Sequence, residues 1–476
     1  MKISNAESVL DYPELLEFLR AHFRNVDEKL AVDVVPKKEL KQINDEIKQI
    51  KNSALAEYIE NNFDYPQSQK SLTSKNCSLT KYIKMWYNTM VTKQSNSTDQ
   101  STLIQLPYAY IKAGGRFEEM YYWDSYFIAL GLNALGKHSQ VEDLTRCMAW
   151  EVEKFGFIPN ASRLYYLDRS QPPVFTLMLK MNKPEVVQEL LPALVKELNW
   201  WYKMRQKTSS FGQLAYYSSS LNTARAESYT ADFTTSLLIP DDKKPELFMH
   251  LRAAAESGWD FSSRWLEVED DLSSIRTSNL FAVDLNCLLY IAEDFLGKNG
   301  IGDFEHRANI RAELINEVFW DEDAKIYTDF DFHNNCLSPR ATLAMVFPLF
   351  AKIATDQKAA YIAEFIKNNL LKTGGLLTTA VISGQQWDAP NGWAPLQWIT
   401  VKALNNYGFS TLADEITTRW VNLCEEVYSS TGKMFEKYNV LNPEKTATGG
   451  EYLVQDGFGW TNGVYLDLKH NMQSKI

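Results

Sequence analysis

The chain has 476 residues, 45% of them hydrophobic, and a formal net charge of −11 at pH 7. A net acidic chain repels phosphate backbones and anionic lipid surfaces, so neither nucleic acid nor a membrane is expected as a partner. The sequence also lacks any uncharged apolar run of about eighteen residues, the length that a membrane-spanning helix needs.

The N-terminal sequence and the cysteines bear on location. The chain begins MKISNAESVLDYPELLEF, with one lysine followed by polar and acidic residues and without the apolar run of a secretory signal. We therefore expect a cytoplasmic protein, with a periplasmic or secreted one as the alternative if the chain is a processed form. The five cysteines are scattered and form no CxxC pair, which favours free thiols in a reducing compartment.

Charged and polar residues dominate the first hundred positions. Residues 31–63 are rich in Lys and Glu and carry a thin apolar stripe, a pattern typical of a helix. Residues 64–101 are rich in Ser, Thr, Gln and Asn, apart from an apolar-periodic stretch around Trp86. We expect residues 1–103 to form an arm of helical and extended segments that packs on the rest of the chain, with mobile stretches near residues 95–101.

Helical periodicity prevails from about Leu106 onward, whereas alternating β-type runs are few and short. Apolar residues recur on one helix face in four stretches, residues 191–201, 285–296, 362–370 and 412–423. The segments between helices suit hairpins whose loops gather at one end of a barrel, where catalytic residues are usually found. We therefore predict an all-α fold, with residues 104–476 as one helical barrel.

The connecting segments are unusually rich in Trp, Arg and carboxylates. The richest are residues 114–126, 160–173, 225–229, 256–265, 385–395 and 434–460. A pyranose has an apolar ring face and hydroxyls that donate and accept, which a group such as Arg116, Trp123 and Asp124 matches. A buried aromatic cluster with an Arg–Asp pair would explain one such segment equally well, but six together favour a carbohydrate pocket.

Cleavage of a glycosidic bond needs two carboxyl groups on opposite sides of that bond. Asp260 follows Gly and Trp in ESGWDF, and apolar surroundings raise the pKa of a carboxyl, so Asp260 is a candidate acid. Glu436, with Phe435 and Tyr438 beside it, is a candidate base. Spacing alone does not separate these two from the 60 acidic residues, any of which could be solvated or ion-paired.

Three long motifs resemble those of the trehalases, a family of inverting glycoside hydrolases. The first runs from Gly114 to Tyr126 as GGRFEEMYYWDSY, and the second from Gln386 to Pro395 as QWDAPNGWAP. The third joins GGEY at residues 449–452 to QDGFGWTNG at residues 455–463. The resemblance covers roughly residues 106–468 and weakens over the first hundred.

The resemblance implies an (α/α)6 barrel, or toroid, that hydrolyses α,α-trehalose to two glucose molecules with inversion and without metal or organic cofactor. By position, Asp260 matches the general acid and Glu436 the general base, with the two carboxyls expected about 6.5–9.5 Å apart. The positions that this match implies for substrate binding are Arg116, Phe117, Trp123, Asp124, Asn160, Arg169, Ser170, Gln171, Arg225, Glu227, Gly258, Gln386, Trp387, Trp393 and Glu451. Trehalose is the expected partner, bound by a monomer.

The sequence departs from the family pattern at three places. Ala113 and Ala226 stand where proline is usual, changes of backbone rigidity that keep the neighbouring polar groups. The glycine run before Glu451 is shortened to Gly449 and Gly450. If that run forms a lid over the pocket, a shorter lid alters the closing rate or KM.

Two rival interpretations stay open. One is a helical-barrel glycosidase that acts on another α-glucoside, which a substrate panel would separate from a trehalase. The other is a catalytically inactive sugar-binding protein, against which the presence of both Asp260 and Glu436 argues. The six histidines lie outside the six rich segments and form no HExxH motif, so no metal site is expected.

Overall fold

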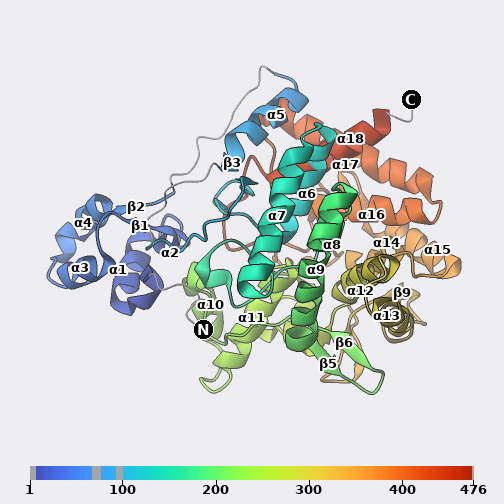
Figure 1. Ribbon diagram of the computed structural model, residues 1–476, viewed down its shortest axis with the longest axis horizontal. Coiled ribbons are helices and arrows are strands. Elements are labelled where there is room, and N and C mark those ends of the chain that lie inside the picture. Colours follow the sequence, from blue (N-terminus) through green and yellow to red (C-terminus); the bar gives the residue numbers. More distant parts are fainter. Residues whose placement is uncertain (1–6, 67–76, 93–99, 474–476) are drawn as a thin grey trace.

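The computed structural model describes residues 7–66, 77–92 and 100–473, and most of these are helical (Figure 1). The all-α prediction is confirmed, because every strand in this described part has only two or three residues. None of the described helices combines the length and the apolar character needed to cross a membrane. The mobility expected near residues 95–101 falls largely on positions outside the described residues.

The helices fall into an N-terminal group and a barrel group. The first comprises α1 (Pro13–Phe23), α2 (Leu30–Asp33), α3 (Leu40–Ile47), α4 (Leu55–Asn62) and α5 (Leu79–Met90). The second comprises α6 (Tyr122–Ala134), α7 (His138–Phe155), α8 (Phe175–Leu179), α9 (Pro184–Arg205), α10 (Tyr229–Ser236), α11 (Lys244–Ser257), α12 (Val283–Lys298), α13 (Phe304–Val318), α14 (Phe347–Phe350), α15 (Asp356–Phe365), α16 (Ala394–Asn406), α17 (Ser410–Thr431) and α18 (Gly459–Gln473).

The strands pair antiparallel into small sheets beside the helices. The pairs are β1 (Val35–Pro36) with β2 (Phe63–Asp64), β3 (Val91–Thr92) with β4 (Tyr110–Ile111), β5 (Gln206–Thr208) with β6 (Gln213–Ala215), β8 (Trp320–Asp321) with β9 (Ile326–Tyr327), β12 (Leu371–Lys372) with β13 (Gly375–Leu376), and β14 (Asn391–Trp393) with β15 (Lys437–Asn439). A three-stranded sheet contains β7 (Leu280–Phe281), β10 (Phe330–Asp331) and β11 (Cys336–Leu337).

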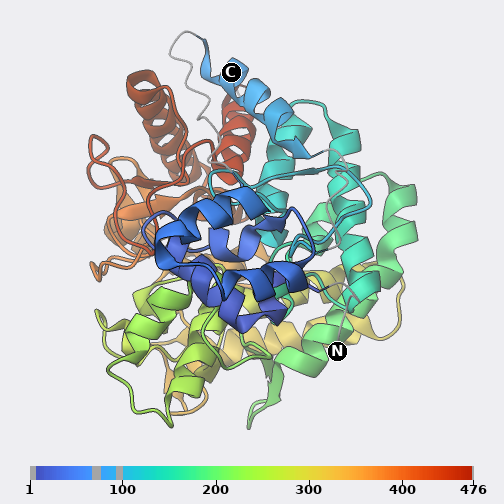
Figure 2. The same ribbon diagram turned by 90° about the vertical axis from the view of Figure 1, so that its left-hand side faces the viewer.

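The barrel closes where its first and last helices meet. Helix α6 packs along α18, and α16 packs on both α14 and α18, so that the helices surround a common centre (Figure 2). In α6, residues 122–132 are all buried, which fits a helix enclosed by other helices. Helix α9 instead buries one stripe, including Leu191, Leu194 and Leu198, as expected of a helix with a solvent-facing side. The predicted helical barrel is confirmed.

Residues 31–63 do not form the continuous helix that their pattern suggests. They contain three short helices, α2, α3 and α4, separated by β1 and turns. Pro36 explains the first break, because proline has no N–H to donate and lies in β1, paired with Phe63 of β2.

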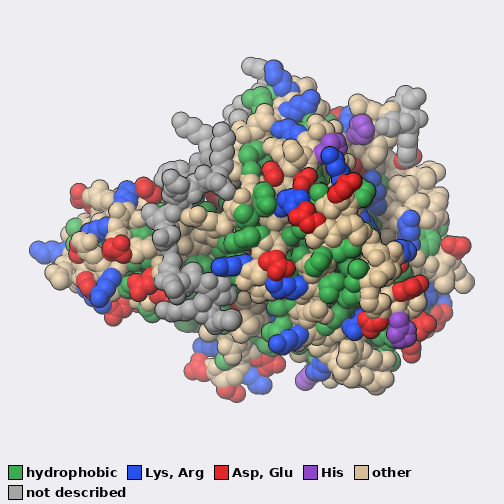
Figure 3. All heavy atoms as spheres, in the orientation of Figure 1, with side chains coloured by type: hydrophobic (Ala, Val, Ile, Leu, Met, Phe, Trp, Pro, Cys, Tyr) green, Lys and Arg blue, Asp and Glu red, His purple; other side chains and the backbone are tan. Residues whose placement is uncertain are grey.

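The helices α1 to α4 lie over one end of the barrel. They project from the barrel in Figure 1 and lie in front of its centre in Figure 2. Helix α5 lies elsewhere, packed on α18 at the side of the barrel, with Trp86 buried. On the face seen in Figure 3, acidic and basic side chains are interspersed over both parts.

Candidate active site

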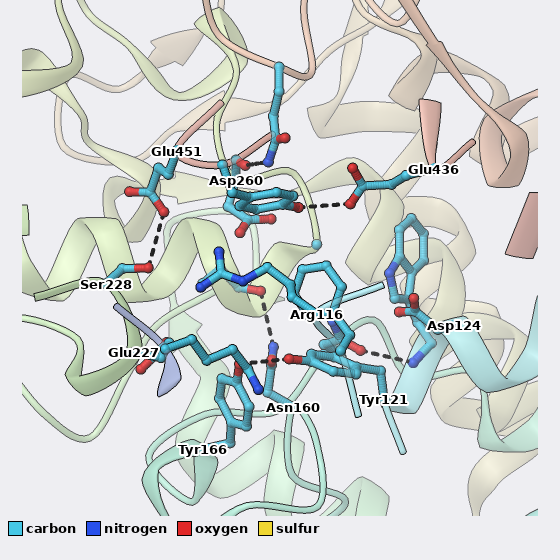
Figure 4. A pocket seen from close by; sticks show the side chains of 18 of the residues that line it. Arg116, Tyr121, Asp124, Asn160, Tyr166, Glu227, Ser228, Asp260, Glu436 and Glu451 are labelled. Carbon is cyan, nitrogen blue, oxygen red and sulfur yellow. Dashed lines mark hydrogen bonds between the residues drawn. The ribbon is translucent and has the colours of Figure 1, made fainter. Parts of the chain in front are cut away.

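A pocket with a cavity volume of about 80 Å³ gathers the loops that the sequence singles out. Every predicted site residue except Ser170 lines it, including Asp260 and Glu436 (Figure 4). The pocket also contains residues that the prediction missed, namely Lys29, Tyr121, Tyr166, Ser228, Ala255, Tyr452, Phe458 and Trp460. Most of these lie in the same six rich segments, but Lys29 belongs to the N-terminal arm, where nothing in the sequence marks it.

Asp260 reaches the pocket because helix α11 ends at Ser257, three residues before it. Gly258 terminates the helix in the left-handed region, with φ 75°, and Trp259 is fully buried. Burial raises the pKa of the Asp260 carboxyl to about 7, with Arg225 opposing this rise and Glu451 adding to it. A carboxyl with this pKa is protonated in slightly acidic solution and can donate a proton.

Asp388 holds the segment that follows Asp260. Its carboxylate accepts hydrogen bonds from Ser262 Oγ at 2.7 Å, from the backbone N–H of Ser263 at 2.7 Å and from Thr379 Oγ1 at 3.0 Å. The Gln386 side chain also donates to the backbone carbonyl of Asp260. The segment after helix α11 is therefore fixed by the loop that carries the second family motif.

Glu436 lies between helix α17 and strand β15 and is buried, with 1% of its surface exposed. Its Oε1 accepts a hydrogen bond of 2.8 Å from the Tyr452 hydroxyl, whereas its buried Oε2 has no hydrogen-bond partner among the described residues. Burial raises the pKa of the Glu436 carboxyl, while Lys437 and the Tyr452 hydroxyl oppose this rise. A carboxylate oxygen in a pocket that has no hydrogen-bond partner is suited to accept a hydrogen bond from water.

A third carboxyl, that of Asp124, lies at the start of helix α6 and is 4% exposed. Burial raises its pKa well above the ordinary value, and the nearby charges of Glu436 and Asp260 raise it further. The Asp124 carboxyl therefore keeps its proton to a higher pH than an exposed aspartate does.

Tryptophan rings form one wall of the pocket. Trp387 stacks on Trp393 with ring centroids 4.0 Å apart, and on Trp259 at 5.6 Å. Trp123 and Trp460 each pack within 6.3 Å of the Trp387 ring. These flat apolar surfaces suit the ring face of a pyranose.

Arginines and carboxylates form the polar side of the pocket. Arg169 donates to Asp168 at 2.9 Å and to Glu227. Arg225 donates to Glu451 at 2.7 Å, and the second Glu451 oxygen accepts a hydrogen bond of 3.2 Å from Ser228. The glycine-rich segment that carries Glu451 is thereby joined to the loop of Arg225 and Ser228 across the pocket.

Two amide side chains in the pocket form hydrogen bonds with the backbone. Asn160 donates to the carbonyls of Ser170 at 3.0 Å and Ala255 at 3.1 Å, and Gln171 accepts from the Trp123 N–H at 3.0 Å. Ser170 is not among the pocket-lining residues, because its hydroxyl donates to the Ile158 carbonyl at 2.6 Å. The Ser170 side chain therefore stabilises the loop and does not face the pocket.

The family model described as Trehalase matches residues 4–473. The periplasmic trehalases of Salmonella paratyphi B and Salmonella agona are each 37% identical over 470 residues, covering 93% of this chain and 82% of each relative. The predicted cytoplasmic location is contradicted by these relatives, whose names place them in the periplasm.

Solved structures give a consistent result. Neutral trehalase from Saccharomyces cerevisiae is 28% identical, with a TM-score of 0.64 over 76% of this chain and 73% of that chain. A mannosylglycerate hydrolase from Thermus thermophilus is 16% identical, with a TM-score of 0.56 over 82% of this chain and 100% of that chain, and shares the fold alone. With a family match over nearly the whole length, the chain belongs to the trehalase family.

Proposed function

We propose that the protein hydrolyses α,α-trehalose to two glucose molecules with inversion at the attacked anomeric carbon. The observation that carries this proposal is one tryptophan-walled pocket lined by two carboxyls in different environments, Asp260 and Glu436. The names of the relatives supply the substrate.

In this mechanism Asp260 is the general acid. Its carboxyl gives a proton to the glycosidic oxygen as the bond between that oxygen and the anomeric carbon breaks. Glu436 is the general base, whose Oε2 accepts a proton from the water that attacks the same carbon from the opposite face. One glucose leaves with its α configuration, and the other forms as the β-anomer.

The remaining pocket residues hold the two sugars. Arg116, Arg169 and Arg225 supply charged donors, and the tryptophans supply apolar faces. Asp124, kept neutral by its surroundings, donates to a sugar hydroxyl. Trehalose is then the small-molecule partner, and a monomer without nucleic-acid or membrane partners remains a prediction.

The proposal is tested by glucose release from trehalose, maltose and kojibiose. A trehalase releases glucose from trehalose at a rate at least about 100-fold above the others, because the pocket must reject isomers that leave its polar groups unpaired. Equal rates on all three would favour the broader α-glucosidase. Calorimetric binding of trehalose without glucose release would favour the inactive sugar-binding protein.

The names of the relatives also support a periplasmic location. A periplasmic protein is released by osmotic shock of the native cells, and recovery only after cell lysis would contradict this location. Cys147, Cys287 and Cys424 are free and buried. Their burial protects these thiols from oxidation in an oxidising compartment.

A further inference from the structure

Three consecutive residues of the N-terminal arm contact three different positions around the pocket. Asp27 accepts a hydrogen bond of 2.5 Å from Arg116 Nη2. Glu28 accepts from the N–H of Thr230 at 2.9 Å and from its hydroxyl at 2.7 Å, at the start of helix α10. Lys29 lies 2.9 Å from Glu119. The arm is thereby joined to two of the loops that carry predicted substrate-binding residues.

A buried ionic cluster fixes this part of the arm. Lys29 and Asp33 are 2% and 1% exposed, and their partners Glu119 and Arg163 come from the barrel. Burial alone would raise the pKa of Asp33, but Arg163 and Lys29 lower it. The cluster pairs two basic side chains with two acidic ones. Removing one member would leave a buried charged group without its partner, so we expect this contact between arm and barrel to be stable.

Arg116 is the pocket residue that Asp27 of the arm contacts. Its Nη2 is engaged by Asp27, and its guanidinium lies 4.9 Å from the centre of the Tyr452 ring. Its Nε is buried and has no hydrogen-bond partner among the described residues. An arginine that lines the pocket and is held through Nη2 is suited to donate a hydrogen bond to a sugar hydroxyl.

The arm also forms the outer wall of a second cavity of about 570 Å³. Val26, Asp27 and Leu30 line it on the arm side, and residues 452–456 line it on the other. Lys29, Arg116 and Tyr452 line both this cavity and the catalytic pocket. Arg116 therefore lies at the boundary between the catalytic pocket and a larger space bounded by the arm.

We propose that Asp27 is a positioning residue for the trehalose-binding site, because it holds Arg116 toward the catalytic pocket from outside the barrel. The inference rests on the proposed function and gives the arm a part in substrate binding. Asp27 itself is not among the residues that line the catalytic pocket, so it acts through Arg116.

The test is a double-mutant cycle on kcat/KM for trehalose. Asp27→Ala lowers kcat/KM by about 10- to 100-fold, the range set by a charge-assisted hydrogen bond, and Asp27→Asn lowers it less because an amide oxygen still accepts from Arg116. In an Arg116→Met background, Asp27→Ala has no further effect. Glu14→Ala, which removes an exposed ion pair with Lys48 on the same arm, is the control and leaves kcat/KM unchanged.

Two results would overturn the inference: an unchanged kcat/KM in Asp27→Ala, or the same loss with and without Arg116. Melting temperatures identify any variant that fails to fold. If Asp27→Ala fails to fold, Asp27→Asn replaces it in the double-mutant cycle. A wild-type chain that binds trehalose but releases no glucose would overturn the proposed function instead, and the same cycle on the calorimetric Kd would still test Asp27.

Discussion

In the proposed mechanism, the environment of Asp260 sets a pH limit on catalysis. Its pKa is raised from 3.8 to about 7, mainly by burial. Because the acid must carry its proton, kcat/KM falls as pH rises through about 7, and it falls at low pH as Glu436 becomes protonated. A pH series of kcat/KM on trehalose measures both limits, and an alkaline limit near pH 5 would contradict the role of Asp260 as the acid.

The same pKa shift links Asp260 to stability. A carboxyl whose pKa is raised on folding stabilises the folded state fully below pH 3.8, and this contribution is lost as pH rises through about 7. Asp260→Asn removes the ionisable group and lowers kcat by about 10²- to 10⁴-fold. Its melting temperature is therefore expected to exceed that of the wild type at pH 8 by more than it does at pH 5.

Thermal melts of Asp260→Asn and wild type at both pH values check this expectation. Asp241→Asn, at an exposed position that is ion-paired with Lys244, is a control in which no such gain at pH 8 is expected. A gain of equal size at pH 5 and pH 8 would show that the carboxyl is not held protonated by the fold.

At this scale the sequence predicts residue types better than roles. Asp260 and Glu436 follow from the resemblance, and both line the pocket. Ser170 lies beside residues that face the pocket, but its hydroxyl bonds to the backbone, and spacing does not reveal that orientation. Lys29 lies far away in the chain, so only the tertiary fold brings it to the pocket.

Among the structural elements, the end of helix α11 positions Asp260, the proposed acid. Gly258 has φ 75°, and a Cβ added there would meet the Trp123 ring at 3.0 Å. Gly258→Ala therefore costs about 1–2 kcal/mol in backbone strain and also displaces Trp123 or Asp260, so kcat/KM falls. Gly156→Ala is the matched control. Gly156 ends helix α7 with φ 88°, and an added Cβ meets nothing within 4 Å, so this variant introduces backbone strain but no new contact.

Urea unfolding and trehalose kinetics on the two glycine variants separate strain from contact. Both lose stability, but only Gly258→Ala loses activity. Full activity in Gly258→Ala would mean that the contact between this turn and Trp123 does not position the acid.

Helices with strong periodicity were predictable, and short ones were not. Residues 191–201 and 285–296 fall within α9 and α12, because a continuous apolar stripe buries one face of a long helix. Residues 31–63 carry a similar pattern but bury it in three short helices over the end of the barrel, with Pro36 between the first two. Hydrophobic periodicity predicts which face of a helix is buried, but it does not predict where the helix ends and the chain turns.

At the scale of the whole molecule, the arm and the barrel share a buried ionic cluster. Lys29→Met leaves Asp33 and Glu119 with Arg163 as the one remaining cation of that cluster, at a cost of about 3–5 kcal/mol in the free energy of unfolding. Lys48→Met, which removes a surface pair with Glu14, costs about 0–1 kcal/mol. Denaturant unfolding measures both variants, and equal costs would mean that the arm is not anchored through Lys29.

The sequence predicts an arm but not what the arm contacts. Asp27, Glu28 and Lys29 look like ordinary surface charges in a polar region, and their partners lie about 90 to 200 positions away. Such contacts depend on the tertiary fold, so no local sequence pattern predicts them. The division of the chain at residue 103 stays a prediction.

Inversion by Asp260 and Glu436 is tested most directly by proton NMR of the anomers during the first seconds of trehalose hydrolysis, before mutarotation. A water activated by Glu436 attacks opposite to the bond that Asp260 protonates, so α-glucose and β-glucose are expected in equal amounts. The appearance of α-glucose alone would contradict this arrangement of acid and base.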